Sequence, residues 1–408
     1  MSRIDSTQQE REEPHGTEAD APGPLTGIRV LDFSSIMAGP VCTRLLADMG
    51  AEVIKVETPE GDHGRTRYPF SNGHSIHFAH LNCGKKSVCL DLKSEEGKQA
   101  ALALARVSDI VVENWRPGVS ARLGLDYDTL RALRPDIIYC AISGYGQTGP
   151  NAKLPAFASL VEAMSGFALS QMRLDGTSRP QNSGLMLGDS LSGLWAFAGI
   201  QTALVQRLRT GKGAMVDLSM HDSLLHNLVY EFHEAQFGIS PRRTHVPHPT
   251  KDGFIHIPPV TERTFQDVAD VMGRPELTAD PRFNTRDAII QNWYELLGII
   301  SEWTKEHTTA ECEQLLAAKG APYGRFRSVA EVLEDPHTIA RGSITTIEFD
   351  GVAYSLPNAA FQISGANTRA KSKVAKLNED ADDVLGGTLG YSPDQIAACA
   401  GSTPRGGH

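Results

Sequence analysis

Short apolar runs alternate with amphipathic stretches along the first half of the chain. The run IRVLDFS at 28–34 is typical of a buried strand, CTRLLADMG at 42–50 has helical spacing, and AEVIKVE at 51–57 predicts a second strand. Strand, helix and strand in about 30 residues form a βαβ unit. The same alternation continues through the segments 86–94, 95–108, 109–115, 127–133 and 135–146. It predicts an α/β fold with a mostly parallel, doubly wound, Rossmann-like sheet.

The second half of the chain continues this pattern and then departs from it. We expect a long apolar helix from about Ser190 to Arg209, a strand at 214–219 and a helix at about 219–232. After Gln236 the sequence becomes rich in Pro, Arg and His, which indicates a boundary. Two further segments follow, a predominantly helical one from Thr261 to about Gly324 and two strands within 347–363 around the turn Asp350-Gly351.

These changes divide the chain into three parts. Residues 1–24 carry charge, Pro and Gly with almost no apolar side chains, so we predict a disordered leader. Residues 25–230 are expected to form a large Rossmann-like domain that the segment 335–400 completes. Residues 245–330 are expected to form a smaller, mainly helical α+β domain.

Composition narrows the classes of partner and compartment. Lys and Arg number 39 against 49 Asp and Glu, a net charge of −10, which argues against nucleic acid as a partner. The longest apolar segment, Leu191 to Val205, is too short to span a membrane, and the first residues show no positively charged region followed by an apolar run. We therefore expect a soluble, cytoplasmic protein without a membrane partner. The cysteines form no CxxC pair and are expected to be reduced core thiols: Cys42, Cys83, Cys89, Cys140, Cys312 and Cys399.

Two motifs point to metal or dinucleotide binding only weakly. His74, His77 and His80 recur every three residues, but no cysteine or acidic cluster accompanies them, so we predict no metal site. The segment 144–149 matches GxGxxG after a strand, but Pro150 follows at once and no strand ending in an acidic residue lies about 20 positions on. A glycine loop at a strand end, which lets a ligand approach the backbone, explains it better.

The segment Gly188-Asp189-Ser190 carries the sharpest chemistry. Asp and Ser both favour the N-cap of a helix, so a capping role is one interpretation. In a second, Ser190 is the nucleophile of a GDSL-type esterase, although the motif lies in mid-chain and lacks a correctly spaced Asp-His pair. In a third, Asp189 is a carboxylate nucleophile that forms a covalent acyl intermediate.

Several basic residues flank the strand ends of the βαβ region. Open parallel sheets bind ligands at the carboxyl ends of their strands, and cations there can meet the phosphates of a nucleotide-like ligand. Each of them is also compatible with a solvated surface position. They are Lys85, Lys86, Lys93, Arg116 and Arg122.

Taken in order, these segments resemble the family III CoA-transferases (the CaiB/BaiF family), a group that includes formyl-CoA and carnitine CoA-transferases and the α-methylacyl-CoA racemases. The resemblance runs from about Leu25 to Ser392. It is carried by LTGIRVLDFSSIMAGPVCTRLLADMGAEVIKVE (25–57), LNCGKKSVCLDLKSEEGK (81–98), VENWRPGVSARLGL (112–125), ISGYGQTGP (142–150), GLMLGDSLSG (184–193), TGKGAMVDLSMHDSLL (210–225), DPRFNTR (280–286) and LEDPHTIARG (333–342).

This resemblance implies that Asp189 is the catalytic nucleophile of a CoA-transferase. The substrates would be an acyl-CoA donor and a carboxylic acid acceptor, with coenzyme A carried between them and no metal or redox cofactor. An interlocked homodimer is implied as well. The residues implied to contact coenzyme A are Met37, Ala38, Leu90, Asp91, Leu92, Lys93, Asn114, Trp115, Arg116, Arg122, Ser143, Gly144, Tyr145 and Gly146.

Two departures from the family pattern qualify these implications. Thr58 stands where the family can carry an Arg that pairs with a CoA phosphate, so Arg65 or Arg67 would have to supply that charge. The glycine-rich lid of formyl-CoA transferases has no counterpart between Phe237 and Pro258.

Three hypotheses about activity and substrate stay open. The His-Asp pair of the racemases is replaced by Phe157 and Ala158, which cannot transfer protons, so a racemase would need His221, His226 or Glu162 instead. A non-catalytic CoA-binding paralogue is the second. Third, a cluster near the domain boundary suits a dicarboxylate: Arg242, Arg243, His245 and His248.

Overall fold

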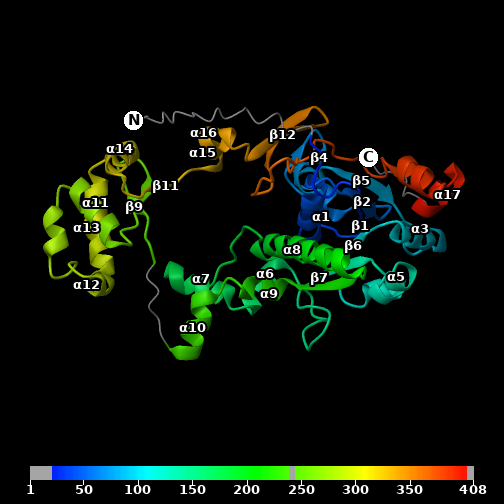
Figure 1. Ribbon diagram of the computed structural model, residues 1–408, viewed down its shortest axis with the longest axis horizontal. Coiled ribbons are helices and arrows are strands. Elements are labelled where there is room, and N and C mark those ends of the chain that lie inside the picture. The colour runs from blue at the N-terminus through cyan, green and yellow to red at the C-terminus, as the bar shows by residue number, and fades with distance from the viewer. Residues whose placement is uncertain (1–20, 239–243, 402–408) are drawn as a thin grey trace, which may run out of the picture. The chain divides into compact units, whose positions relative to one another are not determined.

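The computed structural model describes residues 21–238 and 244–401 (Figure 1). The chain divides into two compact units. The large unit consists of Met1–Val229 with Ile339–His408, and the small unit of Tyr230–Thr338. Each unit has its own apolar core.

A six-stranded sheet forms the centre of the large unit. Its order is β5 (Lys85–Cys89), β2 (Glu52–Glu57), β1 (Arg29–Asp32), β6 (Ile110–Glu113), β7 (Ile138–Ser143) and β8 (Ala214–Ser219). All neighbouring pairs are parallel. Numbered along the chain, these six strands stand in the order 3-2-1-4-5-6 of the Rossmann fold, which confirms the predicted α/β class.

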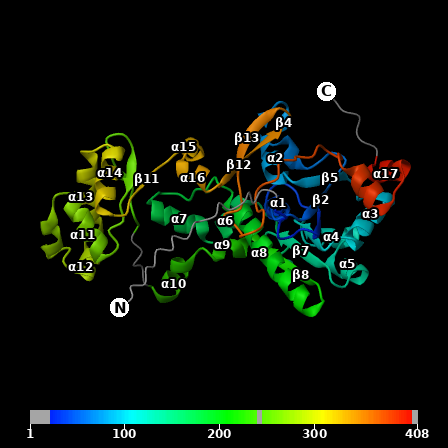
Figure 2. The ribbon, with the colours of Figure 1, turned by 45° about the horizontal axis from the view of Figure 1, so that its top comes forward.

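Helices cover both faces of this sheet because successive residues of each strand point to opposite sides. Leu31 and Tyr139 face the core that contains α3 (Glu95–Arg106), α5 (Tyr127–Leu133) and α17 (Pro393–Ala400). Val30 and Ile138 face the core that contains α1 (Ala38–Asp48) and α8 (Leu187–Thr210). The C-terminal helix α17 therefore lies beside α3, far from it in sequence (Figure 1 and Figure 2).

Shorter elements complete the large unit. After β2 come the 3-10 helix η2 (His63–Thr66), the strand pair β3 (Phe70–Ser71) and β4 (His74–Ser75), and α2 (Ile76–Asn82). Between β6 and β8 lie α4 (Val119–Leu123), α6 (Ala158–Met164) and α7 (Phe167–Asp175). The hairpin β12 (Ile344–Phe349) and β13 (Val352–Pro357) turns at Asp350-Gly351 as predicted, and a π-helix, η4 (Asp382–Thr388), precedes α17.

The helix expected at about 219–232 is two helices, α9 (Met220–Leu225) and α10 (Val229–Phe237). The side-chain amide of Asn227 donates to the carbonyl of Ser223 at 2.9 Å, the acceptor that the backbone N–H of Asn227 would use in a continuous α-helix. That N–H bonds the carbonyl of Leu224 instead. Competition from a short polar side chain therefore ends the first helix.

The small unit is predominantly helical. Its helices are α11 (Glu262–Val271), α12 (Arg286–Gln291), α13 (Trp293–Lys305), α14 (Thr309–Lys319) and α15 (Val329–Leu333), with the 3-10 helix η3 (Pro275–Ala279); α10 and α16 (Pro336–Ala340) cross its two boundaries. A three-stranded sheet of β11 (Gly324–Arg325), β10 (Phe254–His256) and β9 (His248–Pro249) accompanies them. In neither described range is any helix long and apolar enough to cross a membrane.

Close packing of α8 on α1 depends on a glycine. A Cβ added at Gly193 would lie 2.6 Å from Cβ of Val41 and 2.8 Å from the carbonyl oxygen of Ala38. Real Cβ atoms do not approach other atoms this closely, so the helices would have to separate. Since α8 also carries Asp189, this contact fixes where that carboxylate lies.

We expect Gly193→Ala to lower the free energy of unfolding by about 1–3 kcal/mol, because the added methyl group overpacks the interface between α1 and α8. Thermal and urea unfolding of the purified protein measure the loss. Gly298→Ala is the matched control: Gly298 lies in α13 with open space around its Cβ position, so the same change should stabilise by about 0.5–1 kcal/mol. Equal effects from the two substitutions would contradict this account of the packing.

Candidate active site at the strand switch point

The strand order places a binding crevice between β1 and β6. The chain leaves these neighbouring strands toward opposite faces of the sheet, which opens a gap beyond their carboxyl ends. A cavity of about 440 Å³ lies there, within the usual size range of small-molecule sites. Most of its lining comes from the segments that follow β1, β6 and β7 and from the start of α8; Arg67, which follows η2, and Met220 of α9 also line it. We call it the Asp189 cavity.

Two loops meet at this crevice through a reciprocal pair of hydrogen bonds. The backbone N–H of Ser35 donates to the Asn114 side-chain oxygen at 2.9 Å, and the Asn114 amide nitrogen donates to the Ser35 carbonyl at 2.8 Å. Ser35 follows β1 and Asn114 follows β6, so this pair spans the switch point. Asn114 therefore fixes the separation of the two loops at the mouth of the site.

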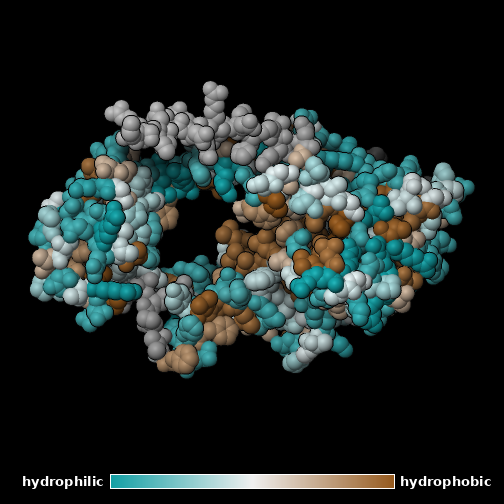
Figure 3. Space-filling view, viewed as in Figure 1, coloured by the Kyte–Doolittle hydropathy of each residue, from teal (hydrophilic) through white to brown (hydrophobic). Residues whose placement is uncertain are grey.

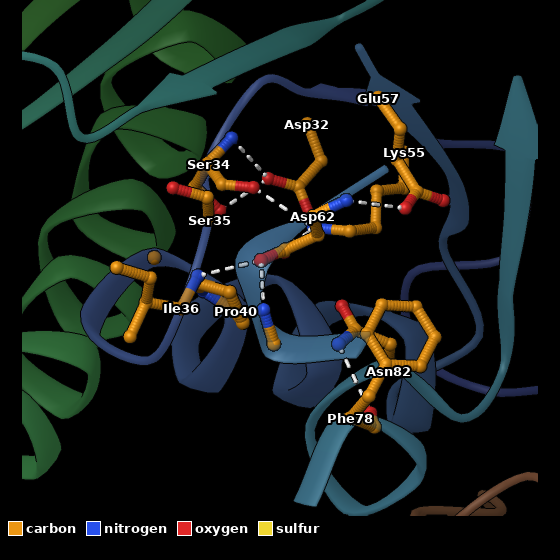
Figure 4. A network of polar contacts seen from close by, with 12 residues as sticks. Asp32, Ser34, Ser35, Ile36, Pro40, Lys55, Glu57, Asp62, Phe78 and Asn82 are labelled. Atoms are coloured by element: carbon orange, nitrogen blue, oxygen red, sulfur yellow. Dashed lines mark hydrogen bonds and ion pairs between the residues drawn. The ribbon is translucent and has the colours of Figure 1, made fainter. Parts of the chain in front are cut away.

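A buried ion pair between Lys55 and Asp62 also holds the loop after β1 (Figure 4). The Lys55 ammonium lies 2.7 Å from a carboxylate oxygen of Asp62 and donates to the Ser34 carbonyl at 2.8 Å. Both side chains are about 2% exposed. The other Asp62 oxygen accepts from the backbone N–H groups of Ile36 at 3.2 Å and Gly64 at 2.7 Å. Burial disfavours the charged form of each group, but the opposite charge of its partner outweighs this effect. The pKa of Asp62 is therefore lowered and that of Lys55 is raised.

A second lysine lies beneath this loop. The Lys85 ammonium is held by Asp32 at 3.1 Å, by the Thr43 hydroxyl at 2.7 Å and by the Asn82 side-chain oxygen at 2.9 Å. Burial, only partly offset by Asp32, lowers the pKa of Lys85 to about 8. Lys85 is therefore a structural cation under the site, and the expectation that it meets ligand phosphates is wrong.

The loop that these polar groups hold is strained. Ile36 lines the Asp189 cavity with φ of 69°, a left-handed conformation that a β-branched side chain rarely adopts. Such strain costs about 1–3 kcal/mol and persists only where the surroundings impose it. The Asp62 carboxylate bonded to the Ile36 N–H supplies that constraint.

Asp189 enters the cavity from the first turn of α8. The helix begins at Leu187, and Met186 occupies the N-cap position with φ of 49° and ψ of 48°. Asp189 is thus the third helical residue, so the N-cap interpretation is wrong for both Asp189 and Ser190. Burial raises the pKa of Asp189 to about 6; the Glu162 charge also raises it, while the Arg67 charge lowers it.

Glu162 is a second carboxylate in this cavity. It lies on α6, is 2% exposed and lines the cavity. Its two oxygens accept from the backbone N–H of Ser183 at 3.1 Å and the Ser183 hydroxyl at 3.0 Å. From the sequence, Glu162 is only a substitute base, because nothing in the spacing of α6 distinguishes a residue that faces a cavity from one that faces the core. His221 and His226, the other two candidates, line neither this cavity nor the one described next.

Seven of the residues implied to contact coenzyme A lie around Asp189: Met37, Ala38, Asn114, Trp115, Arg116, Ser143 and Gly144. The remaining lining includes Phe157 and Ala158, at the positions of the racemase pair. Gly144 is required here, since a Cβ would lie 2.1 Å from that of Ala156. The glycine loop therefore closes against the segment that precedes α6.

Another group of predicted residues lines a second cavity of about 500 Å³, which we call the Lys93 cavity: Leu90, Asp91, Leu92 and Lys93. It lies beyond the carboxyl ends of β2 and β5 and shares Ser35 and Trp115 with the Asp189 cavity. Thr58 is in its wall. The two cavities thus adjoin along one edge of the sheet.

Three predicted contact residues line neither cavity. Arg122 lies on α4, and the Tyr145 ring lies 6.0 Å from that of His221. Gly146 lies beside Asp217, whose carboxylate accepts from the Gln147 N–H. Their predicted contacts with coenzyme A stay predictions.

The two arginines named as replacements for the family Arg at position 58 differ in whether their guanidinium groups are already paired. Arg65 makes two hydrogen bonds of 2.7 Å to Glu57 and lies 3.8 Å over the Phe78 ring, so its guanidinium is already committed. Arg67 lines the Asp189 cavity. Of the two, only Arg67 faces a described cavity.

The proposed dicarboxylate cluster receives no support from its described members. Arg242 and Arg243 lie outside the described residues. His245 packs against the rings of His256 and Trp293, and His248 is fully buried with a 2.8 Å contact to Ser301. Among the described residues, no group of three or more His, Cys, Asp or Glu is arranged to hold a metal ion.

Comparison with known proteins identifies the family. A profile described as CoA-transferase family III matches residues 25–381. The chain is 38% identical to the succinyl-CoA–D-citramalate CoA-transferase of Chloroflexus aurantiacus, over 92% of this chain and 96% of that protein. It is 32% identical to the succinyl-CoA:glutarate CoA-transferase of Mus musculus, over 93% and 90% of the two chains.

A solved structure agrees with the sequence matches. The crystal structure of a CAIB/BAIF family protein from Brucella suis superimposes with a TM-score of 0.77 at 32% identity, covering 92% of this chain and 100% of that one. These similarities exclude the GDSL esterase interpretation of Ser190. The chain belongs to CoA-transferase family III.

Proposed function

We propose that this enzyme transfers coenzyme A from an acyl-CoA thioester to a carboxylic acid, with Asp189 as the nucleophile. The observation that carries the proposal is a half-buried carboxylate at the start of α8, in a cavity at the switch point of a Rossmann sheet. Membership of family III and the names of its relatives support the reaction class. The acids in those relatives' names, citramalate, glutarate and succinate, are all dicarboxylic.

The reaction has four balanced steps. The Asp189 carboxylate attacks the donor thioester carbonyl, giving an aspartyl–acyl anhydride and CoA thiolate. The thiolate attacks the aspartyl carbonyl, releasing the donor acid and leaving an aspartyl-CoA thioester. The acceptor carboxylate attacks this thioester, forming a second anhydride and freeing the thiolate. Attack of the thiolate on the acceptor carbonyl yields the new acyl-CoA and returns Asp189 as a carboxylate.

The position of Asp189 suits this chemistry. With a pKa of about 6 the carboxyl is largely ionised at neutral pH, yet it is more basic than an ordinary aspartate. The first N–H groups of an α-helix lack partners within the helix, so the start of α8 offers donors toward an oxyanion. Partial burial excludes water that would hydrolyse the anhydride.

Coenzyme A would extend across the two adjoining cavities. We place the thioester in the Asp189 cavity, where the nucleophile lies, and the phosphate-bearing end toward the Lys93 cavity. Lys93 and Arg116 are the predicted contact residues whose charges suit phosphate oxygens. The shared residues Ser35 and Trp115 would then lie beside the pantetheine arm.

We propose in addition that the enzyme is a homodimer. Figure 3 shows apolar side chains gathered over the part of the large unit that carries α8. Exposed large apolar residues on and around α6 and α8 include Phe157, Leu160, Met164, Leu194 and Trp195. A contiguous apolar surface of this kind is typical of a protein–protein interface.

We expect incubation with acyl-CoA donors such as succinyl-CoA and acetyl-CoA to leave a covalent CoA or acyl adduct on Asp189, detected by intact-protein and peptide mass spectrometry. Asp189→Ala should form none. Asp128→Ala, which changes a largely exposed carboxylate on α5, should form the adduct as the wild type does. An adduct on another residue would contradict the mechanism, and solvent deuterium entering the α-carbon without any adduct would indicate a racemase.

Glu162→Gln should shift the acid limb of the pH–rate profile to lower pH. The wild-type limb is expected near pH 6, because Asp189 must lose its proton to act. Removing the Glu162 charge lowers the pKa of Asp189, so the limb should move down by about half a pH unit or more. Glu334→Gln, an exposed residue after α15, should leave the profile unchanged. A shift to higher pH would contradict the assigned electrostatics.

A further inference from the structure

Arg67 is a cation placed in the Asp189 cavity by a rigid backbone. Its N–H donates to the Gly64 carbonyl at 3.1 Å, and its carbonyl accepts from the Ser75 hydroxyl at 2.6 Å. The preceding η2 turn is capped by Asp62, the partner of Lys55. The buried pair that holds the loop after β1 therefore also fixes the backbone from which the Arg67 side chain extends.

The Arg67 guanidinium itself is uncommitted. Among the described residues no hydrogen bond or ion pair to its side chain is present, and its residue is exposed at the cavity wall. The neighbouring Arg65 shows the contrast, since Glu57 and the Ala375 carbonyl already use its donors. A planar cation with five unpaired donors at a cavity wall is suited to a ligand carboxylate or phosphate.

The charged groups around Asp189 leave an unpaired guanidinium that can receive a carboxylate at the acyl end. The charged residues of the cavity wall are Arg67, Arg116, Glu162 and Asp189. The two that act on the Asp189 carboxyl are Arg67 and Glu162. Glu162 accepts its hydrogen bonds from Ser183 and forms no ion pair with Arg67, so the guanidinium keeps its donors for a ligand carboxylate.

Coenzyme A phosphates do not fit this position as well. The pantetheine arm, a long chain of single bonds, separates them from the thioester that Asp189 attacks. Because Arg67 lines the cavity that holds Asp189, we place its guanidinium at the acyl end of the substrate. Arg116 lines the same cavity and follows in sequence Trp115, a residue that the two cavities share, so we assign Arg116 rather than Arg67 to the phosphates.

We propose that Arg67 binds the second carboxylate of a dicarboxylic substrate while the first reacts at Asp189. The guanidinium fork would form two parallel N–H···O bonds to the distal carboxylate, in the acyl-CoA donor and in the acceptor acid alike. This inference rests on the proposed CoA transfer and deepens it, because it names the substrate class and the residue that selects it. The bonds to the distal carboxylate are the same in ground state and anhydride, so Arg67 acts mainly on binding.

The test compares donors of equal carbon number with and without a distal carboxylate: malonyl- and propionyl-CoA, succinyl- and butyryl-CoA, glutaryl- and valeryl-CoA. The rate of adduct formation on Asp189 is followed by mass spectrometry at donor concentrations that give KM and the limiting rate separately. We expect the wild type to prefer at least one dicarboxylic donor. Arg67→Gln should raise KM for that donor by about ten- to a hundredfold and alter its monocarboxylic match by less than about threefold.

Two further variants keep the test specific. Arg67→Lys retains the charge but loses the fork, so an intermediate KM is expected. Arg106→Gln, an exposed arginine at the end of α3 that lines neither cavity, should behave as wild type. Binding of free CoA to Arg67→Gln, measured by calorimetry, should be unchanged.

The outcomes separate this inference from the proposed function. No adduct from any donor with the wild type would defeat the proposed function itself. If all donors form the adduct and Arg67→Gln changes KM equally for each, Arg67 only alters the pKa of Asp189. If Arg67→Gln weakens the binding of free CoA, Arg67 binds a phosphate. Either of these results, or a wild type that does not favour dicarboxylic donors, overturns the inference while leaving CoA transfer intact.

Discussion

The ion pair between Lys55 and Asp62 is the constraint on which the site depends. The single carboxylate of Asp62 pairs with the buried Lys55 ammonium, caps the η2 turn and accepts a hydrogen bond from the N–H of Ile36. Breaking a buried pair by removing one partner typically costs about 3–5 kcal/mol, because the other charge is left uncompensated. The strained loop after β1 and the segment that leads to Arg67 are both attached to this pair. Loss of the pair would therefore disturb two segments that line the Asp189 cavity, the loop with Ile36 and the segment with Arg67.

The role proposed for Asp189 requires a carboxylate that is partly dehydrated but still ionised. Three features of the structure meet that demand at Asp189. The close approach of α8 to α1 through Gly193 fixes the helix, and the left-handed N-cap Met186 makes Leu187 its first residue, so that Asp189 lies in the first turn. Burial and Glu162 raise the pKa, while Arg67 limits the rise. The balance of these opposing effects leaves a carboxylate with a pKa near the acid side of neutrality.

Much of the fold follows from local patterning, whereas the lining of the site does not. Alternating short strands and helices predict the parallel sheet, and its strand order then selects the crevice between β1 and β6. The start of α8 was misplaced because Asp and Ser are good N-cap residues in isolation, and only the tertiary packing reveals that Met186 takes that position. Local sequence does not distinguish Lys85 from a phosphate ligand, because its partners Asp32 and Thr43 are distant in sequence.

Arg67 and Glu162 illustrate the same limit. Their neighbours in sequence give no sign of a cavity, because that cavity is built from segments far apart along the chain. The family resemblance pointed correctly to the family, but it could not tell which of the implied contact residues line a cavity: Arg122 and Tyr145 lie outside both described cavities. Long-range contacts therefore decide which polar groups can reach a substrate.

The most direct test of the account follows oxygen from the acceptor acid. A carboxylic acid labelled with oxygen-18 is supplied with unlabelled acyl-CoA, and the peptide containing residue 189 is analysed after one turnover. Transfer through two anhydrides predicts that one labelled oxygen appears in the Asp189 carboxylate. Formation of the new acyl-CoA with no label in that peptide would contradict the role of Asp189 as the covalent carrier.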